Sequence, residues 1–246
     1  MRPKERDQLE VYDVTTYSQL RRLTVPDLRS VTDMTSCTHF FCVYISDHHG
    51  ECIHSLGVEA SAFTRWSVED RPSCLSVNAS HNVLAACPNV RKIKEFSSHG
   101  DLLREIKLPD DVIHPWHTIQ TRENEFIVCH GDEDDAVHCV CKISADGRHI
   151  VHSHGGQRGS GHDQYDGPFH LAVDRDEFVF VADCRNRRVR LLSPTLRHVR
   201  NIVSHDQLKW RPFRLYFDVL RSRLYVADNE LKEIKYKSSR VVVFSA

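Results

Sequence analysis

Five prolines recur along the chain at nearly constant spacing, and each stands before a short apolar strand, a turn and a second, more apolar strand. They are spaced by 46, 43, 53 and 44 residues and are Pro26, Pro72, Pro115, Pro168 and Pro212. A period of about 40–45 residues built only from short strands is typical of propeller blades. No segment has the helical period that a parallel α/β fold needs between its strands. The sequence therefore predicts an all-β propeller of four-stranded antiparallel blades.

The clearest unit has predicted strands at 170–174, 178–182, 188–192 and 199–203. Its second strand is apolar on both faces, which suits a strand packed between neighbouring blades. The last unit, from residue 212, lacks a fourth strand, whereas 11–14 and 21–25 look like the third and fourth strands of a blade. We therefore expect one domain, 1–246, whose N-terminal strands pair with the C-terminal unit and close the ring, because closure removes exposed strand edges.

Composition sets limits on function and location. The net charge of −1 gives no overall attraction to nucleic acid or acidic membranes, although residues 184–246 hold 15 Lys and Arg against five Asp and Glu. Nine cysteines cannot all pair, and several lie inside apolar runs. Together with a polar first segment and no run of 18 apolar residues, this predicts reduced, buried thiols in a cytoplasmic protein that does not span a membrane.

One unit carries a more specific pattern. It reads Pro168-Phe-His-Leu-Ala-Val-Asp174, then Phe178-Val-Phe-Val-Ala-Asp183, then Asn186-Arg-Arg-Val189, and the last unit follows it over 212–218 and 224–229. This pattern resembles an NHL repeat. The resemblance implies a β-propeller, most often with six blades, although five proline-anchored units are visible here. NHL propellers often end tripartite-motif (TRIM) ubiquitin ligases, where they act as recognition modules for proteins or structured RNA. The chain has no RING or B-box pattern, so ligase chemistry would lie outside it.

The basic C-terminal region supplies the first candidate site. Its members are arginines with one neighbouring aromatic residue, namely Arg185, Arg187, Arg188, Arg211, Arg214 and Trp210. Such a cluster suits phosphate contact and base stacking. Charge runs are also common on solvated faces, so a binding role competes with a plain surface.

The second candidate is a ring around the propeller axis. The residue two after each proline should lie at one height in the channel, which places Leu28, Cys74, His117, His170 and Arg214 there. Two imidazoles and a thiol, His117, His170 and Cys74, are possible Zn²⁺ ligands. The alternative is histidines that hydrogen-bond backbone or water. A channel ion would favour a hydrolase or lyase of the lactonase or amidating type, to which related propellers belong.

A third candidate lies on one hairpin, where Cys129 and His130 precede His138, Cys139 and Cys141. Strand alternation points His138 away from the face that Cys139 and Cys141 share, which disfavours a common metal. The acidic run 132–135 between these strands lacks the spacing of a calcium loop and is interpreted as a solvated turn.

The sequence thus favours a non-catalytic scaffold that presents loops from a rigid ring to a protein partner, as in the substrate-recognition part of a TRIM-type ligase. Structured RNA bound by the basic blades is the first alternative, and a metal-dependent hydrolase or lyase is the second. No cofactor, nucleotide or catalytic residue is predicted. The identity of the partner, the blade number and the oligomeric state stay open at this point.

Overall fold

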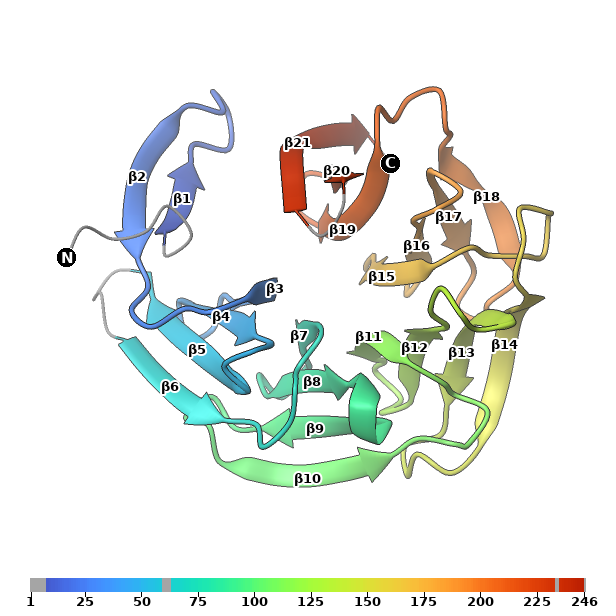
Figure 1. Ribbon diagram of the computed structural model, residues 1–246, viewed down its shortest axis with the longest axis horizontal. Coiled ribbons are helices and arrows are strands. Elements are labelled where there is room, and N and C mark those ends of the chain that lie inside the picture. Colours follow the sequence, from blue (N-terminus) through green and yellow to red (C-terminus); the bar gives the residue numbers. More distant parts are fainter. Residues whose placement is uncertain (1–7, 59–62, 233–234, 246) are drawn as a thin grey trace.

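The computed structural model describes residues 8–58, 63–232 and 235–245, and these form five β-sheets arranged as blades around one axis (Figure 1). The first four blades each have four antiparallel strands in sequence order from the axis outward. The first blade is β3 (Val31–Cys37), β4 (Cys42–Asp47), β5 (Cys52–Gly57) and β6 (Phe63–Ser67). The second is β7 (Leu75–Val77), β8 (Val83–Cys87), β9 (Lys92–Phe96) and β10 (Leu102–Lys107), with the short 3-10 helix η2 (Pro88–Val90).

The third blade is β11 (Pro115–Gln120), β12 (Phe126–His130), β13 (Val137–Ile143) and β14 (Ile150–Gln157). The fourth is β15 (Pro168–Val173), β16 (Val179–Asp183), β17 (Arg188–Leu192) and β18 (His198–Val203). The last blade has three strands, β19 (Arg211–Asp218), β20 (Arg223–Lys232) and β21 (Lys235–Ser245). Two further strands, β1 (Gln8–Tyr12) and β2 (Gln19–Thr24), form a separate hairpin.

Hydrophobic clusters join four pairs of successive blades among the described residues. One cluster packs Tyr44 of the first blade with Leu75 and Phe96 of the second. Equivalent clusters join the second blade to the third, the third to the fourth and the fourth to the last. Second strands such as β8, β12 and β16 are buried at every residue, as expected for strands covered on both faces. Through this packing, neighbouring blades lie face to face around the axis and form a disc.

The inner strands share a kink that aims one side chain at the axis. β3, β11 and β15 each carry a register shift between their first and third residues, and β19 carries one between its second and fourth residues. Such a bulge bends a strand and re-aims the following side chain. In three of these strands the bulged residue is aromatic, and the rings of Trp116, Phe169 and Phe213 stack in series at centroid distances of 4.7 and 4.3 Å.

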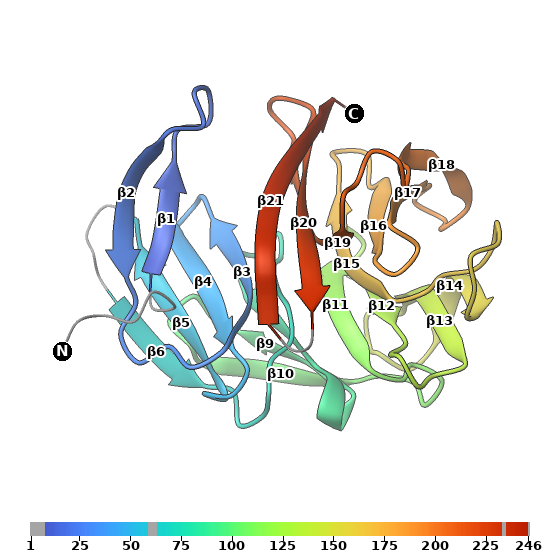
Figure 2. The same ribbon diagram turned by 45° about the horizontal axis from the view of Figure 1, so that its top comes forward.

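The ring closes differently from the prediction. The described residues form five blades, not the six that the NHL resemblance implies, and β1 pairs with β2 alone while β21 pairs with β20. The hairpin lies against the first blade, where Leu9 and Leu23 pack on Ile45 and Leu56 (Figures 1 and 2). Burying a leucine side chain is worth about 1.5–3 kcal/mol, so this face gives the hairpin a stable position without pairing to the last blade.

The thiol prediction is confirmed for all nine cysteines, which are buried and unpaired. No helix in the part of the chain that the structure describes is long and apolar enough to cross a membrane.

Candidate functional site

Five side chains form a belt around the axis at one height. Each stands opposite the residue that precedes Asp47, Cys87, His130, Asp183 or Asp228 on its blade's second strand. The five are Asp33, Cys74, His117, His170 and Arg214. The sequence predicted four of these five residues. For the first blade it predicted Leu28, which was wrong, because Asp33 holds that position. In the first blade Val31 pairs with Asp47 as Pro168 pairs with Asp183, so Val31 occupies the place of the proline and Pro26 lies outside the repeat. The belt is defined by these five residues.

The belt satisfies backbone groups that the fold leaves open. An innermost strand has no strand partner on the side of the axis, so its N–H groups need another acceptor. The residue after the belt position supplies the donor in three blades. Leu75 N–H donates to Asp33 Oδ2 at 2.8 Å, Leu171 N–H donates to His117 Nδ1 at 3.2 Å and Leu215 N–H donates to His170 Nδ1 at 3.3 Å. The belt therefore links neighbouring blades.

An ion pair links the last blade to the first. Arg214 Nε donates to Asp33 Oδ1 at 2.8 Å, and a second nitrogen of the same guanidinium donates to Thr32 O. The Asp33 side chain is 2% exposed. Burial opposes its ionisation, but Arg214 and then His170 outweigh burial and hold the pKa of Asp33 well below its usual range.

The belt imidazoles have a fixed protonation pattern. Because each Nδ1 accepts a backbone N–H, the proton of the neutral ring must sit on Nε2. His117 Nε2 then donates to Leu75 O at 3.2 Å, and His170 Nε2 faces Asp33 Oδ2 at 3.5 Å. Burial lowers the pKa of both rings. A metal on Nε2 would require the loss of that proton or of the Nδ1 bond, so the histidine-backbone alternative fits the geometry better than the channel-ion hypothesis.

An axial cavity of about 520 Å³ adjoins the belt. All five inner strands line it, with Met34, Leu75, Ile119, Val173 and Phe217 as apolar examples. His117 and His170 are its polar members from the belt. The cavity is therefore an apolar-walled space with two neutral imidazoles on its wall.

The predicted binding arginines divide into two places. Arg185, Arg187 and Arg188 follow the end of β16, whereas Arg211 begins β19 and Arg214 belongs to the belt. Arg187 donates to His205 O and Leu208 O. Trp210, at the end of the loop before β19, lies under the ammonium of Lys209 at 4.6 Å. The six predicted residues thus belong to the neighbouring fourth and last blades, and Arg187 reaches the loop that leads to Trp210.

Arg188 anchors a long loop. Its Nε donates to the buried carboxylate of Asp183 at 2.7 Å, and its other nitrogens donate to carbonyls of the 158–167 segment, namely Ser160 O, Gly161 O and Gln164 O. Asn186 also donates to Asp183 at 2.9 Å. These contacts explain the Asp, Asn and Arg spacing of the NHL-like motif as a loop tether.

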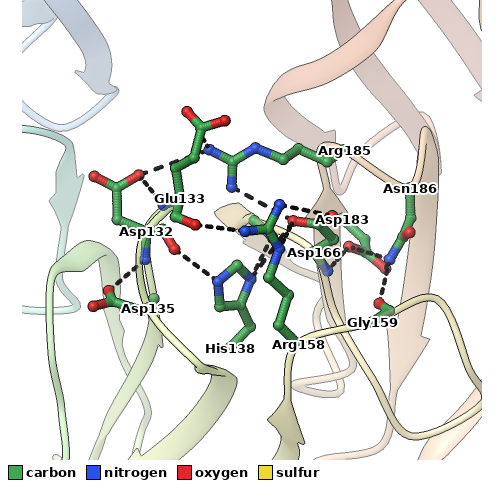
Figure 3. Close-up of polar contacts among 12 residues, drawn as sticks. Asp132, Glu133, Asp135, His138, Arg158, Gly159, Asp166, Asp183, Arg185 and Asn186 are labelled. Atoms are coloured by element: carbon green, nitrogen blue, oxygen red, sulfur yellow. Dashed lines mark hydrogen bonds and ion pairs between the residues drawn. The ribbon is translucent and has the colours of Figure 1, made fainter.

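Arg185 lies in a polar network between the third and fourth blades (Figure 3). Its guanidinium pairs with Asp132 at 3.8 Å, Glu133 at 3.5 Å and Asp166 at 3.5 Å. Arg158 pairs with the same Asp166 oxygen at 2.9 Å. The acidic run is therefore a mostly exposed turn, as expected, in which Asp132 and Glu133 also pair with Arg185 of the neighbouring blade.

The loop tether gives a first prediction. Replacing Arg188 with Met should lower the free energy of unfolding by about 2–3 kcal/mol, because several charge-assisted hydrogen bonds are lost together. Limited proteolysis should then cut within 158–167 faster than in the parent chain. Arg200→Met on the exposed strand β18 is the matched control and should change neither measurement. Equal cleavage of both variants would contradict the tether.

The hairpin candidate forms no joint site. His130 pairs with Cys139 across β12 and β13, yet His138 donates from Nε2 to Asp132 O and accepts Gly167 N–H at Nδ1, both at 2.8 Å. Both nitrogens of His138 are therefore occupied, as the strand alternation had suggested.

Sequence reasoning missed a second hollow. It holds about 740 Å³ between the β1–β2 hairpin and the first blade, and every residue of β1 lines it together with Met34, Val43 and Leu56. We call it the outer trough. It shares Met34 and Val43 with the axial cavity. No local motif marks it, because it arises from where the hairpin packs.

No protein-family model matches the chain, and no curated protein matches it. Solved structures do resemble it. A streptogramin B lyase structure is 14% identical with a TM-score of 0.60, over 88% of this chain and 68% of that one. A catalytically inactive virginiamycin B lyase from Staphylococcus aureus with quinupristin is 13% identical with a TM-score of 0.61, over 97% and 74%. Hydrazine synthase from Kuenenia stuttgartiensis is 11% identical with a TM-score of 0.68, over 98% and 90%. At these identities the likeness shows a five-bladed β-propeller fold and no activity.

Proposed function

We propose that this chain is a non-catalytic recognition module that binds an extended segment of a protein partner in the outer trough. The observation that carries the proposal is the missing fifth inter-blade core. Within the described residues, hydrophobic clusters join four pairs of successive blades, whereas the last and first blades meet through Arg214 and Asp33 near the axis. The trough adjoins that sector, because one of its walls is the β1–β2 hairpin, which lies between the first blade and β21 (Figure 1).

The walls of the sector suit an extended peptide. Met34 and Tyr216 are each 60% exposed although both line the axial cavity, and Tyr12, which lines the outer trough together with Met34, is 51% exposed. Large exposed apolar side chains gathered around a hollow are typical of binding surfaces.

The flanks of the sector supply hydrogen-bonding groups. Among the described strands, β1 and β21 each pair on one side alone, and β1 is the hairpin strand nearer to β21 in both views (Figures 1 and 2). An unpaired strand edge binds extended peptides through backbone hydrogen bonds, while the apolar walls take alternate side chains. The occupant is therefore an extended segment with alternating apolar residues. The NHL-like motif supports placing such a module in a TRIM-type ligase whose chemistry lies elsewhere.

This proposal predicts a selective effect of one charged substitution. Met34→Asp should weaken binding of peptides selected from a random display library at least about tenfold, because a carboxylate placed in an apolar trough loses hydration. Leu20→Asp is the matched control, since Leu20 is 62% exposed and lies outside the trough. The readout is peptide fluorescence anisotropy, with amide hydrogen exchange to show protection of β1 on binding.

Other outcomes would favour other functions. Selected peptides that bind Met34→Asp as tightly as the parent chain would contradict the trough. An RNA partner would give an affinity that falls steeply with salt, is lost in Arg211→Glu and ignores Met34→Asp. The RNA alternative has less support, because Arg185, Arg187 and Arg188 already bind groups of the protein itself.

A further inference from the structure

The first blade departs from the fourth and last blades at the position where Arg188 and Arg240 stand. Asp183 pairs with Arg188 and Asp228 pairs with Arg240, each across the second and third strands and each at 2.7 Å. In the first blade the equivalent carboxylate is Asp47, and the residue opposite it is Cys52. The guanidinium that balances the buried carboxylate in the fourth and last blades is therefore replaced by a thiol.

A histidine joins this pair. His54 lies two residues after Cys52 on β5 and so points to the same face. His54 Nε2 is 3.4 Å from Cys52 Sγ and 3.5 Å from Asp47 Oδ2. All three residues are buried, and their donor atoms lie within 4.8 Å of one another.

The donor set and spacing suit Zn²⁺. Zinc takes thiolate, imidazole and carboxylate ligands, and ligands at its usual bond lengths in a tetrahedron stand about 3.3–3.6 Å apart. A dication with Cys52 thiolate and Asp47 carboxylate makes a neutral buried group. The dication would supply the positive charge that arginine provides in the fourth and last blades. Such a charge matters because a buried carboxylate without a partner is costly.

The protonation of His54 permits ligation where that of the belt does not. His54 is fully buried, and no described group donates to its Nδ1, so a shift of the ring proton from Nε2 to Nδ1 on metal binding would break no existing hydrogen bond of Nδ1. The similar group Asp33, Cys74 and His170 differs, because His170 Nδ1 accepts a backbone N–H and Arg214 already pairs with Asp33.

A partial second shell is present. Asp47 accepts backbone N–H groups of Arg29 and Ser30 at 2.8 Å, which fixes its carboxylate. A small surface pocket of about 170 Å³, lined in part by Cys52 and Arg65, lies beside the site. We propose that Asp47, Cys52 and His54 form a three-ligand Zn²⁺ site in the first blade, with a fourth position for water.

Cobalt substitution tests this site directly. The full chain is treated with a chelator, dialysed and titrated with Co²⁺. We expect a single equivalent to give a thiolate-to-cobalt charge-transfer band and the intense visible bands of tetrahedral cobalt, both removed by Zn²⁺. Cys52→Ser should abolish the charge-transfer band, and His54→Gln should weaken Co²⁺ binding at least about 100-fold. Cys74→Ser, in the similar group at the axis, is the matched control and should keep both bands.

Two further readouts do not depend on whether the variants fold. X-ray absorption of the zinc-loaded parent chain should show one sulfur among nitrogen and oxygen ligands. Zinc should also raise the melting temperature of the parent chain, because it binds the folded state. A parent chain without a charge-transfer band, an equal band in Cys52→Ser, or its loss in Cys74→Ser would each overturn the assignment.

Discussion

Acidification from pH 7 to pH 5 is expected to destabilise this protein strongly, because it buries neutral histidines. Burial lowers the pKa of His130 to about 4 and places that of His117 well below its usual range. The unfolded chain has ordinary imidazoles with a pKa of about 6.5, so between these values it binds more protons than the folded chain. As the pH is lowered below about 6.5, the free energy of unfolding therefore decreases until the pH reaches the pKa of the ring in the folded chain. At pH 5 the decrease is about 2 kcal/mol for each such ring.

Carboxylates do not account for this fall. Asp33 has a lowered pKa, so it stays ionised in both states throughout this window. Asp183 acts in the opposite direction, because burial raises its pKa in the folded chain. Urea unfolding at a series of pH values measures the effect.

A single variant identifies the histidine contribution. His130→Leu removes a buried ring whose Nδ1 has no hydrogen-bond partner, and should reduce the loss between pH 7 and pH 5 by about 2 kcal/mol. A variant with the same pH dependence as the parent chain would show that His130 is not the group that titrates. An overall stability that is level between pH 7 and pH 5 would contradict the role of burial.

The second large effect concerns closure of the ring. Arg214→Met should lower the free energy of unfolding at pH 7 by about 3–5 kcal/mol, because it leaves the carboxylate of Asp33 buried without its cation. Hydrogen exchange should quicken first in β3 and β19, the strands that this pair joins. Guanidinium unfolding gives the free energy.

The double variant Asp33→Asn, Arg214→Met is the matched control. Its amide oxygen can still accept the Leu75 N–H without carrying a charge, so it should recover most of the lost stability. A loss below about 1 kcal/mol for Arg214→Met alone would mean that the ring does not depend on this pair. A double variant as unstable as the single one would shift the cause from charge to packing.

Much of the fold was predictable because the blades are locally encoded. Strands such as β8 and β17 alternate or run apolar within five residues, and turns between them are short. Four of the five belt positions followed from counting two residues past a proline. The fifth failed because Pro26 has the spacing of the repeated prolines, whereas Val31 occupies the structural position of the proline in the first blade. Only the strand register distinguishes the two residues.

The candidate sites were less predictable, because their contacts join residues distant in sequence. Arg188 reaches carbonyls more than 20 positions earlier in the chain, and Arg214 meets Asp33 from the opposite end of the ring. A count of arginines therefore indicated a basic surface, whereas several of their guanidinium groups are occupied inside the protein. The group of Asp47, Cys52 and His54 carries a local signal, since Cys52 and His54 alternate on one strand and Asp47 faces Cys52 across a short hairpin turn, but its spacing matches no familiar zinc motif.

By itself the sequence determined that this chain folds as repeated antiparallel blades with buried, unpaired thiols, because strand periodicity and turn chemistry act over a few residues. Only the tertiary structure decided that there are five blades, that the β1–β2 hairpin packs on the first blade, and that an ion pair joins the last blade to the first. The physical reason is that a strand edge or a buried charge takes whichever partner the whole ring brings to it, and that partner is not encoded near it in the chain.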